Sequence, residues 1–157
     1  PYMAARRQGR RPPPDRLPVL HRTWHEVVAA LGKPERLVIG GKSMGGRMAS
    51  LVADEADVRG LLCFGFPFHA PGNEPGGRIA HLEALRTPAL IVQGTRDPFG
   101  GTADVAGYAL SDSIAVHWLD DGDHDFKPRA ASGHTQSQHW EEAMDTVTAF
   151  LNEVATR

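Results

Sequence analysis

The expected fold rests on one stretch, Arg36-Leu-Val-Ile-Gly-Gly-Lys-Ser-Met-Gly-Gly-Arg-Met-Ala-Ser50. Its apolar run Leu37–Ile39 lacks polar alternation, which is typical of a strand covered on both faces of a parallel sheet. After two glycines, apolar residues recur at helical spacing from Met44 onward. The sequence therefore predicts a strand, a sharp turn and a helix in immediate succession.

The turn, Gly41-Lys-Ser-Met-Gly45, matches the G-x-S-x-G pattern of a nucleophile elbow. In such an elbow a strained backbone lifts the serine hydroxyl, here of Ser43, out of the sheet, and amides at the helix start face a developing anion. We expect Gly41 and Gly45 to be required, because side chains there would meet the neighbouring strand and helix. An ordinary glycine-rich turn is the alternative. A phosphate-binding loop is excluded because its pattern needs glycine where Arg36 stands.

Composition suits a single globular domain over residues 1–157, with 41% apolar residues. The formal charge of −2 gives no reason to expect a nucleic acid or an acidic membrane as partner. A lone cysteine, Cys63, forms no internal disulfide, and the start Pro1-Tyr2-Met3 shows no signal peptide, which favours the cytoplasm. Residues 1–16 hold five arginines and a run of three prolines, which predict an extended basic loop. That loop is either a solvated connection or a rim that attracts an anionic substrate.

Downstream, apolar runs alternate with helical patterns. We expect strands over Val58–Phe66, Pro88–Gly94 and Ile114–Leu119. We expect a first helix that is capped by Asp15 and ended by Gly32, and a second that is capped by Thr102. A last helix over 135–155 should bury a stripe of apolar residues, Trp140, Ala143, Met144, Val147, Phe150, Leu151 and Val154. This alternation predicts an α/β fold, a three-layer αβα sandwich with a mostly parallel sheet.

His21 and His25 share one helix face at i, i+4, the spacing of a metal-ligand pair. Glu26 follows His25, so the pattern is not H-E-x-x-H, and the sequence shows no third ligand. We interpret both as surface histidines and predict no metal and no cofactor.

Ser43, His69, Asp97 and His124 all follow predicted strands. Because ligands bind at the carboxyl ends of strands in open α/β sheets, these residues are expected to meet at one edge. The chain order Ser43, Asp97, His124 is that of a serine hydrolase triad, with His124 as general base and Asp97 holding its imidazole.

Four aspartates around His124 offer alternative partners for its imidazole: Asp120, Asp121, Asp123 and Asp125. Four clustered carboxylates also suggest a calcium loop, but their spacing lacks the D-x-[DN]-x-[DN]-G pattern and the distal glutamate, which argues against calcium.

The chain resembles the small dienelactone-hydrolase-like branch of the α/β hydrolases. The resemblance rests on four segments, Gly40–Arg47, Phe66–Gly72, Gly94–Pro98 and Gly122–Phe126. It implies a cofactor-free, esterase-like hydrolase of a small ester, thioester or lactone, with catalytic Ser43, Asp97 and His124, the Met44 amide in the oxyanion hole, and Lys42 and His69 against the substrate. A non-catalytic interaction module of the same fold is the alternative. The substrate itself is not predicted.

Domains of that group carry further strands upstream, and an early glycine-rich loop donates the second oxyanion amide. These residues contain no such loop. We therefore expect an N-terminally incomplete domain, a truncation or an ordered part of a longer chain. The elbow strand would then be a bare, apolar sheet edge, through which two copies could pair as a homodimer.

Overall fold

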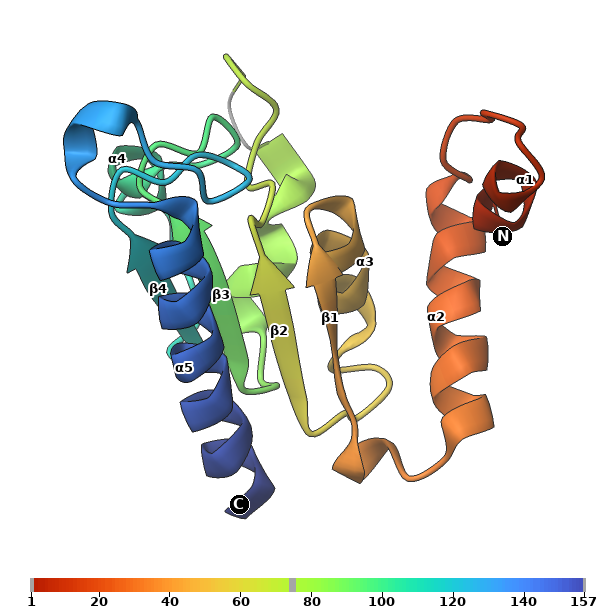
Figure 1. Ribbon diagram of the computed structural model, residues 1–157. Coiled ribbons are helices and arrows are strands. Elements are labelled where there is room, and N and C mark those ends of the chain that lie inside the picture. The colour runs from red at the N-terminus through yellow and green to blue at the C-terminus, as the bar shows by residue number, and fades with distance from the viewer. Residues whose placement is uncertain (1, 74–75, 157) are drawn as a thin grey trace.

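The computed structural model describes residues 2–73 and 76–156 (Figure 1). Its α-helices are α1 (Tyr2–Arg7), α2 (Leu17–Leu31), α3 (Met44–Val52), α4 (Thr102–Val105) and α5 (Gln136–Thr156). Its strands are β1 (Val38–Lys42), β2 (Gly60–Phe64), β3 (Ala89–Gly94) and β4 (Ile114–Leu119). Short 3₁₀ helices are η1 (Pro34–Arg36), η2 (Gly76–Arg78), η3 (Ala80–Ala84) and η4 (Ala130–Ser132).

The four strands form one parallel sheet in the order β1-β2-β3-β4. Val38 lies opposite Gly60, Leu61 opposite Ala89, and Ala89 opposite Ile114, so each strand adds beside its predecessor. Helix α3 packs on β1 and β2, whereas α5 packs on β3 and β4 from the other side (Figure 1). The predicted three-layer α/β fold is confirmed.

A hydrophobic core lies on each face of the sheet. On the α3 face, Ala49, Val52 and Leu61 pack around the fully buried Cys63, and burial raises the pKa of its thiol. On the α5 face, helix and sheet meet through the buried residues Leu90, Val92, Leu119, Phe126, Ala143 and Val147. The central strand β3 is buried along its whole length, which explains its continuous apolar sequence.

The N-terminal segment differs from its prediction. Residues 2–7 form the helix α1 rather than an extended loop. Alanine and arginine, which make up residues 4–7, are strong helix formers, and the overall arginine and proline content of residues 1–16 concealed that local preference. The chain leaves this helix through Gly9, at φ 78°, and has neither helix nor strand from Arg10 to Arg16.

Two predicted caps are wrong. Arg16, not Asp15, occupies the N-cap of α2, in an extended conformation and without a side-chain cap. Gly101, not Thr102, precedes α4, and its N–H donates to the Asp104 carboxylate at 2.9 Å. An acid in the first turn therefore replaces the expected hydroxyl cap. The strand predicted over Val58–Phe66 is also shorter, since β2 covers only Gly60–Phe64.

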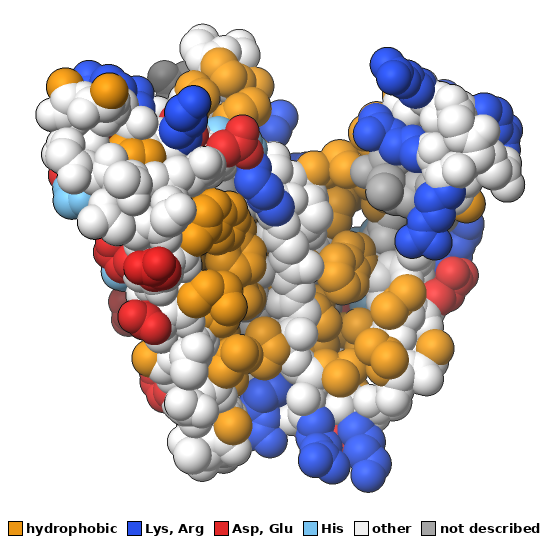
Figure 2. All heavy atoms as spheres, viewed as in Figure 1, with side chains coloured by type: hydrophobic (Ala, Val, Ile, Leu, Met, Phe, Trp, Pro, Cys, Tyr) orange, Lys and Arg blue, Asp and Glu red, His pale blue; other side chains and the backbone are white. Residues whose placement is uncertain are grey.

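Strand β1 pairs with β2 and, within residues 2–73 and 76–156, with no other strand. The predicted buried stripe of α5 is wrong at three positions, because Trp140, Met144 and Leu151 are exposed. Leu17, Val27 and Leu31 of α2 are exposed as well. Figure 2 shows apolar side chains along this side of the molecule, where no described segment covers them. Among the described helices, none is long and apolar enough to cross a membrane.

Candidate active site

Ser43 stands between the last residue of β1 and the first of α3. Its backbone adopts φ 52° and ψ −122°, in the region that side chains other than glycine rarely enter. Its N–H donates to the Phe64 carbonyl at 2.8 Å, which extends the pairing of β1 with β2 to the serine itself. Such strain costs about 1–3 kcal/mol and persists where surrounding contacts fix the backbone.

Of the two glycines that this turn was expected to require, Gly41 and Gly45, only Gly41 has a close neighbour. A Cβ at Gly45 would meet no atom within 4 Å, so the predicted clash there is wrong. A Cβ at Gly46 would lie 2.6 Å from the Gly41 carbonyl oxygen and 3.1 Å from Cys63 Sγ. At Gly41 the closest approach is 3.1 Å, to the Gly45 carbonyl carbon. The close packing of α3 on the sheet therefore depends on Gly41 and Gly46.

The structure brings Ser43, His124 and Asp97 into one hydrogen-bonded chain. Ser43 Oγ lies 3.0 Å from His124 Nε2, and His124 Nδ1 lies 2.8 Å from Asp97 Oδ2. A carboxylate only accepts, so Nδ1–H donates to Asp97, which leaves Nε2 to accept the Ser43 hydroxyl proton. The Asp97 side chain is fully buried and that of His124 is one-fifth exposed.

Asp97 is fixed by groups that the sequence analysis did not single out. Gln93, itself fully buried on β3, donates through Nε2 to Asp97 Oδ2 at 3.0 Å. The Phe99 N–H donates to Asp97 Oδ1 at 2.9 Å. Both carboxylate oxygens are therefore hydrogen-bonded, which compensates for taking the charge out of water. A polar residue inside an otherwise apolar strand was the available signal.

His124 is also positioned by its neighbours on both sides. The Phe99 ring lies with its centroid 4.6 Å from that of the imidazole. A Cβ at Gly65 would lie 3.2 Å from His124 Cε1 and Nδ1, so glycine leaves the space that the ring occupies. Gly65 also adopts φ 59° directly after β2, which favours glycine for a second reason.

The four aspartates near His124 have other partners. Asp121 is buried and pairs with Arg129 and Arg96, and the hydrogen bond from Arg129 lowers the pKa of its carboxyl to about 2. Asp123 accepts the N–H groups of residues 125 and 127, Asp125 pairs with Lys42 at 2.6 Å, and Asp120 lies 3.6 Å from His134. These contacts shape the loop, and Asp97 is the carboxylate that reaches His124.

Comparison with known proteins identifies the family of this fold. A family model described as an alpha/beta hydrolase domain matches residues 1–152. The chain belongs to the α/β hydrolase family. The match extends over most of the sequence, including all four strands and the Ser43, Asp97 and His124 segments.

Two solved structures resemble this α/β hydrolase. One is the predicted CIB-like hydrolase from Thermoplasma acidophilum, with a TM-score of 0.61 and 19% identity over 87% of this chain and 60% of that one. The other is the esterase domain of a Rhodothermus marinus protein, with a TM-score of 0.49 and 18% identity over 66% of this chain and 58% of that one. The chain thus spans about three-fifths of the Thermoplasma hydrolase. At 19% identity, the similarity to that structure shows a shared fold alone.

In this α/β hydrolase, Lys42 lies at the elbow and His69 lies beside the Asp97 loop. Lys42 precedes Ser43, and its ion pair with Asp125 joins the elbow to the His124 loop. The side chain of His69 is buried. The backbone N–H of His69 donates to the Phe99 carbonyl at 3.1 Å, which places the residue beside the loop that carries Asp97. Its Nε2 lies 3.4 Å from Asp104 without forming a hydrogen bond. Substrate contacts of Lys42 and His69 stay predictions.

Proposed function

We propose that this α/β hydrolase is a serine hydrolase that cleaves small esters, thioesters or lactones through Ser43, His124 and Asp97. The observation that carries the proposal is the hydrogen-bonded chain from Ser43 Oγ through His124 to the buried Asp97 carboxylate, with separations of 3.0 and 2.8 Å. Nucleophile, base and orienting acid are thus within bonding distance of one another.

The reaction proceeds in two halves. His124 Nε2 accepts the Ser43 proton as Oγ forms a bond to the acyl carbon, and the resulting imidazolium is stabilised by Asp97. The intermediate collapses, the bond to the leaving oxygen or sulfur breaks, and His124 returns the proton to that leaving group. Water then attacks the acyl-serine with the same proton transfers, which releases the acid and restores Ser43. His124 is the residue that takes up and returns the proton in both halves.

The oxyanion is proposed to lie against the start of α3. Met44 is the first residue of that helix, and first-turn amides have no acceptor within their own helix. Its N–H therefore supplies one donor to the developing negative charge. A missing second donor typically lowers the rate by about 10²–10³-fold.

We further propose that the protein is of the small dienelactone-hydrolase-like type and that upstream strands join β1 and carry the second oxyanion donor. Support comes from the edge of β1 that no described strand pairs with, and from the exposed apolar residues of α2 and α5 on the same side. A homodimer through that edge is the competing arrangement. Sedimentation of the natural, full-length protein distinguishes the two, because a paired edge gives a dimer.

The test is intact-mass analysis before and after reaction with a fluorophosphonate probe. We expect one adduct per chain, none in Ser43→Ala, and an unchanged adduct in Ser137→Ala, a matched change at an exposed serine of α5. The rate should rise by about 100-fold or more in a longer natural protein that carries the second donor.

An adduct that survives Ser43→Ala would assign the reactivity to another residue and contradict the proposal. Failure of the longer natural protein to react would instead favour the non-catalytic interaction module. A panel of small esters, thioesters and lactones, with Ser43→Ala as blank, then identifies the acyl class.

A further inference from the structure

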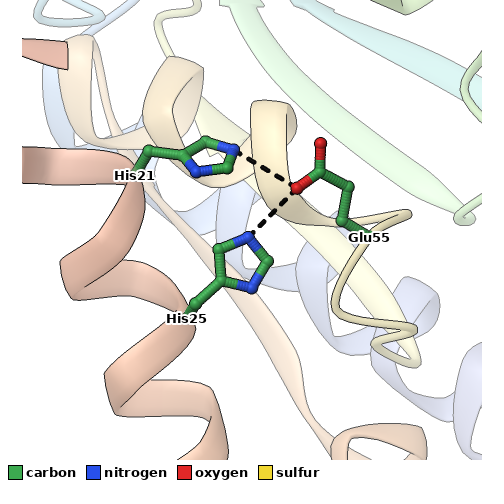
Figure 3. Close-up of side chains that lie close together, drawn as sticks. All are labelled: His21, His25 and Glu55. Atoms are coloured by element: carbon green, nitrogen blue, oxygen red, sulfur yellow. Dashed lines mark hydrogen bonds and ion pairs between the residues drawn. The ribbon is translucent and has the colours of Figure 1, made fainter. Parts of the chain in front are cut away.

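Three side chains of the kinds that bind metals lie close together near the end of α3 opposite to Ser43. Figure 3 shows His21 and His25 projecting from α2 toward Glu55, which lies just beyond the end of α3. Sequence analysis found the histidine pair but no third ligand, because Glu55 is 30 residues from His25 along the chain. The packing of α2 on α3 brings them together.

We propose that His21, His25 and Glu55 bind one Zn²⁺ ion that ties α2 to the turn after α3. Two imidazole nitrogens and a carboxylate oxygen form a mixed donor set that suits zinc, whereas calcium and magnesium prefer oxygen ligands alone. A water completes the four-coordinate site.

The distances fit this assignment. Glu55 Oε2 lies 3.4 Å from His21 Nε2 and 3.1 Å from His25 Nε2, and the three ligand atoms all lie within 4.8 Å of one another. Tetrahedral zinc with bonds of about 2.0–2.2 Å separates its ligands by about 3.4 Å. A point equidistant from the three atoms lies no more than about 2.4 Å from each, so small rotations of the rings reach zinc bond lengths.

The site is accessible to solvent, and hydrogen bonds fix the turn that carries Glu55. The histidine side chains are each 35% exposed and that of Glu55 is 60% exposed, which leaves room for an ion and its water. The turn that carries Glu55 is anchored by Asp54, which accepts the N–H groups of Arg86 and Thr87 at 3.0 and 2.8 Å. Glu55 is therefore held by a fixed backbone while α2 supplies the histidines.

The proposed ion is structural rather than catalytic. Helix α3 has nine residues, with Ser43 before its first and Glu55 beyond its last, so about 13 Å of helix separates the two sites. Helix α2 has one buried residue, Val28, and exposes Leu17, Val27 and Leu31. A metal bond to α3 would fix a helix that packing alone holds weakly.

The experiment is a Zn²⁺ titration of tag-free, EDTA-treated full chain in competition with a chromophoric chelator. We expect one Zn²⁺ per chain with a Kd on the order of 1–10 µM, weaker than sites with four protein ligands. His21→Ala, His25→Ala and Glu55→Gln should each raise Kd at least about tenfold. Zn²⁺ should also raise the melting temperature of the natural sequence but not of His25→Ala.

His117→Ala is the matched control. His117 Nε2 also lies against a glutamate, Glu142, at 2.8 Å, but the described residues give this pair no second histidine. Zinc affinity should be unchanged in this variant, and zinc removal should not alter fluorophosphonate labelling of Ser43. Unchanged affinity in Glu55→Gln and His25→Ala, or an equal loss in His117→Ala, would overturn the proposed site.

Discussion

Gln93→Leu tests the buried hydrogen bonds that connect β3 to the candidate acid. Gln93 Oε1 accepts the Phe66 N–H at 2.7 Å, and its Nε2 donates toward Asp97 Oδ2 and the Gly100 carbonyl, each at 3.0 Å. Leucine has a similar volume and keeps the strand packed, so the substitution removes these contacts without opening a large cavity.

Three backbone groups lose their Gln93 partner in this variant, the N–H and the carbonyl of Phe66 and the carbonyl of Gly100. The Phe66 carbonyl still accepts the Phe68 N–H at 3.0 Å, so two groups are left without a partner. A buried polar group without a partner costs about 1–3 kcal/mol, so the pair gives about 2–6 kcal/mol. The added apolar burial of leucine offsets about 1 kcal/mol. We expect a loss of about 3 kcal/mol from the free energy of unfolding, together with a fluorophosphonate labelling rate about tenfold lower as Asp97 loses alignment.

Urea unfolding at pH 7, followed by tryptophan fluorescence, measures the first effect through the change in midpoint multiplied by the slope. Gln8→Leu is the control, because Gln8 is exposed and its side chain contacts Arg10; we expect a change below about 0.5 kcal/mol. If Gln93→Leu also stays within about 0.5 kcal/mol of the natural sequence, the buried network contributes no net stability and the reasoning is refuted.

Two further substitutions test the close approach of Gly94 to the His124 loop and the hydrogen bonds of Asp54 after α3. In Gly94→Ala the new Cβ would lie 2.3 Å from the Gly122 carbonyl oxygen and 2.5 Å from that of Asp123, so we expect urea unfolding to show a loss of about 3 kcal/mol. Gly107→Ala, with its nearest atom at 3.5 Å, should change little, and equal effects would contradict the steric argument. Burial alone would raise the pKa of Asp54, but hydrogen bonds from Thr87 and Arg86 outweigh it and lower that pKa. Asp54→Asn should therefore lower the free energy of unfolding by about 1–2 kcal/mol at pH 7. This difference from the natural sequence should vanish as the pH falls below about 3.9 and through the lowered pKa of folded Asp54. A difference that persists at pH 2 would show that the Asp54 charge is not its source.

Much of the fold was predictable because its signals are local. The strand predicted over Ile114–Leu119 is observed with those bounds, and the strand-turn-helix around Ser43 follows from a short apolar run, glycines and helical spacing. Helix α1 was missed because the arginine and proline content of residues 1–16 was averaged over a helical part and a proline-rich part. Caps were missed because the atom that bonds a terminal amide depends on backbone geometry, as Asp104 shows at Gly101.

The residues proposed to react could be predicted from the sequence, but the residues that contact and position them could not. Ser43, Asp97 and His124 follow strand ends, and the parallel topology brings strand ends to one edge. Gln93 gave a weaker signal, one polar residue in an apolar strand, and Glu55 gave none, because a glutamate after a helix is usually solvent-exposed. The contacts of Gln93 with Phe66 and of Glu55 with His25 join segments 27 and 30 residues apart, which no local pattern encodes.

The position of Ser43 beside an open edge links two properties of the site. On one side, the Phe64 carbonyl and the close approach of Gly46 to Gly41 fix the strained serine. On the other, no described strand hydrogen-bonds to β1, and a groove beside it is lined by Val38 and by Leu151 of α5. A strained backbone persists only where its surroundings over-determine it. Strands added at this edge would therefore stabilise the elbow and bring a second oxyanion donor in one step, so the stability of the elbow and the labelling rate of Ser43 should rise together.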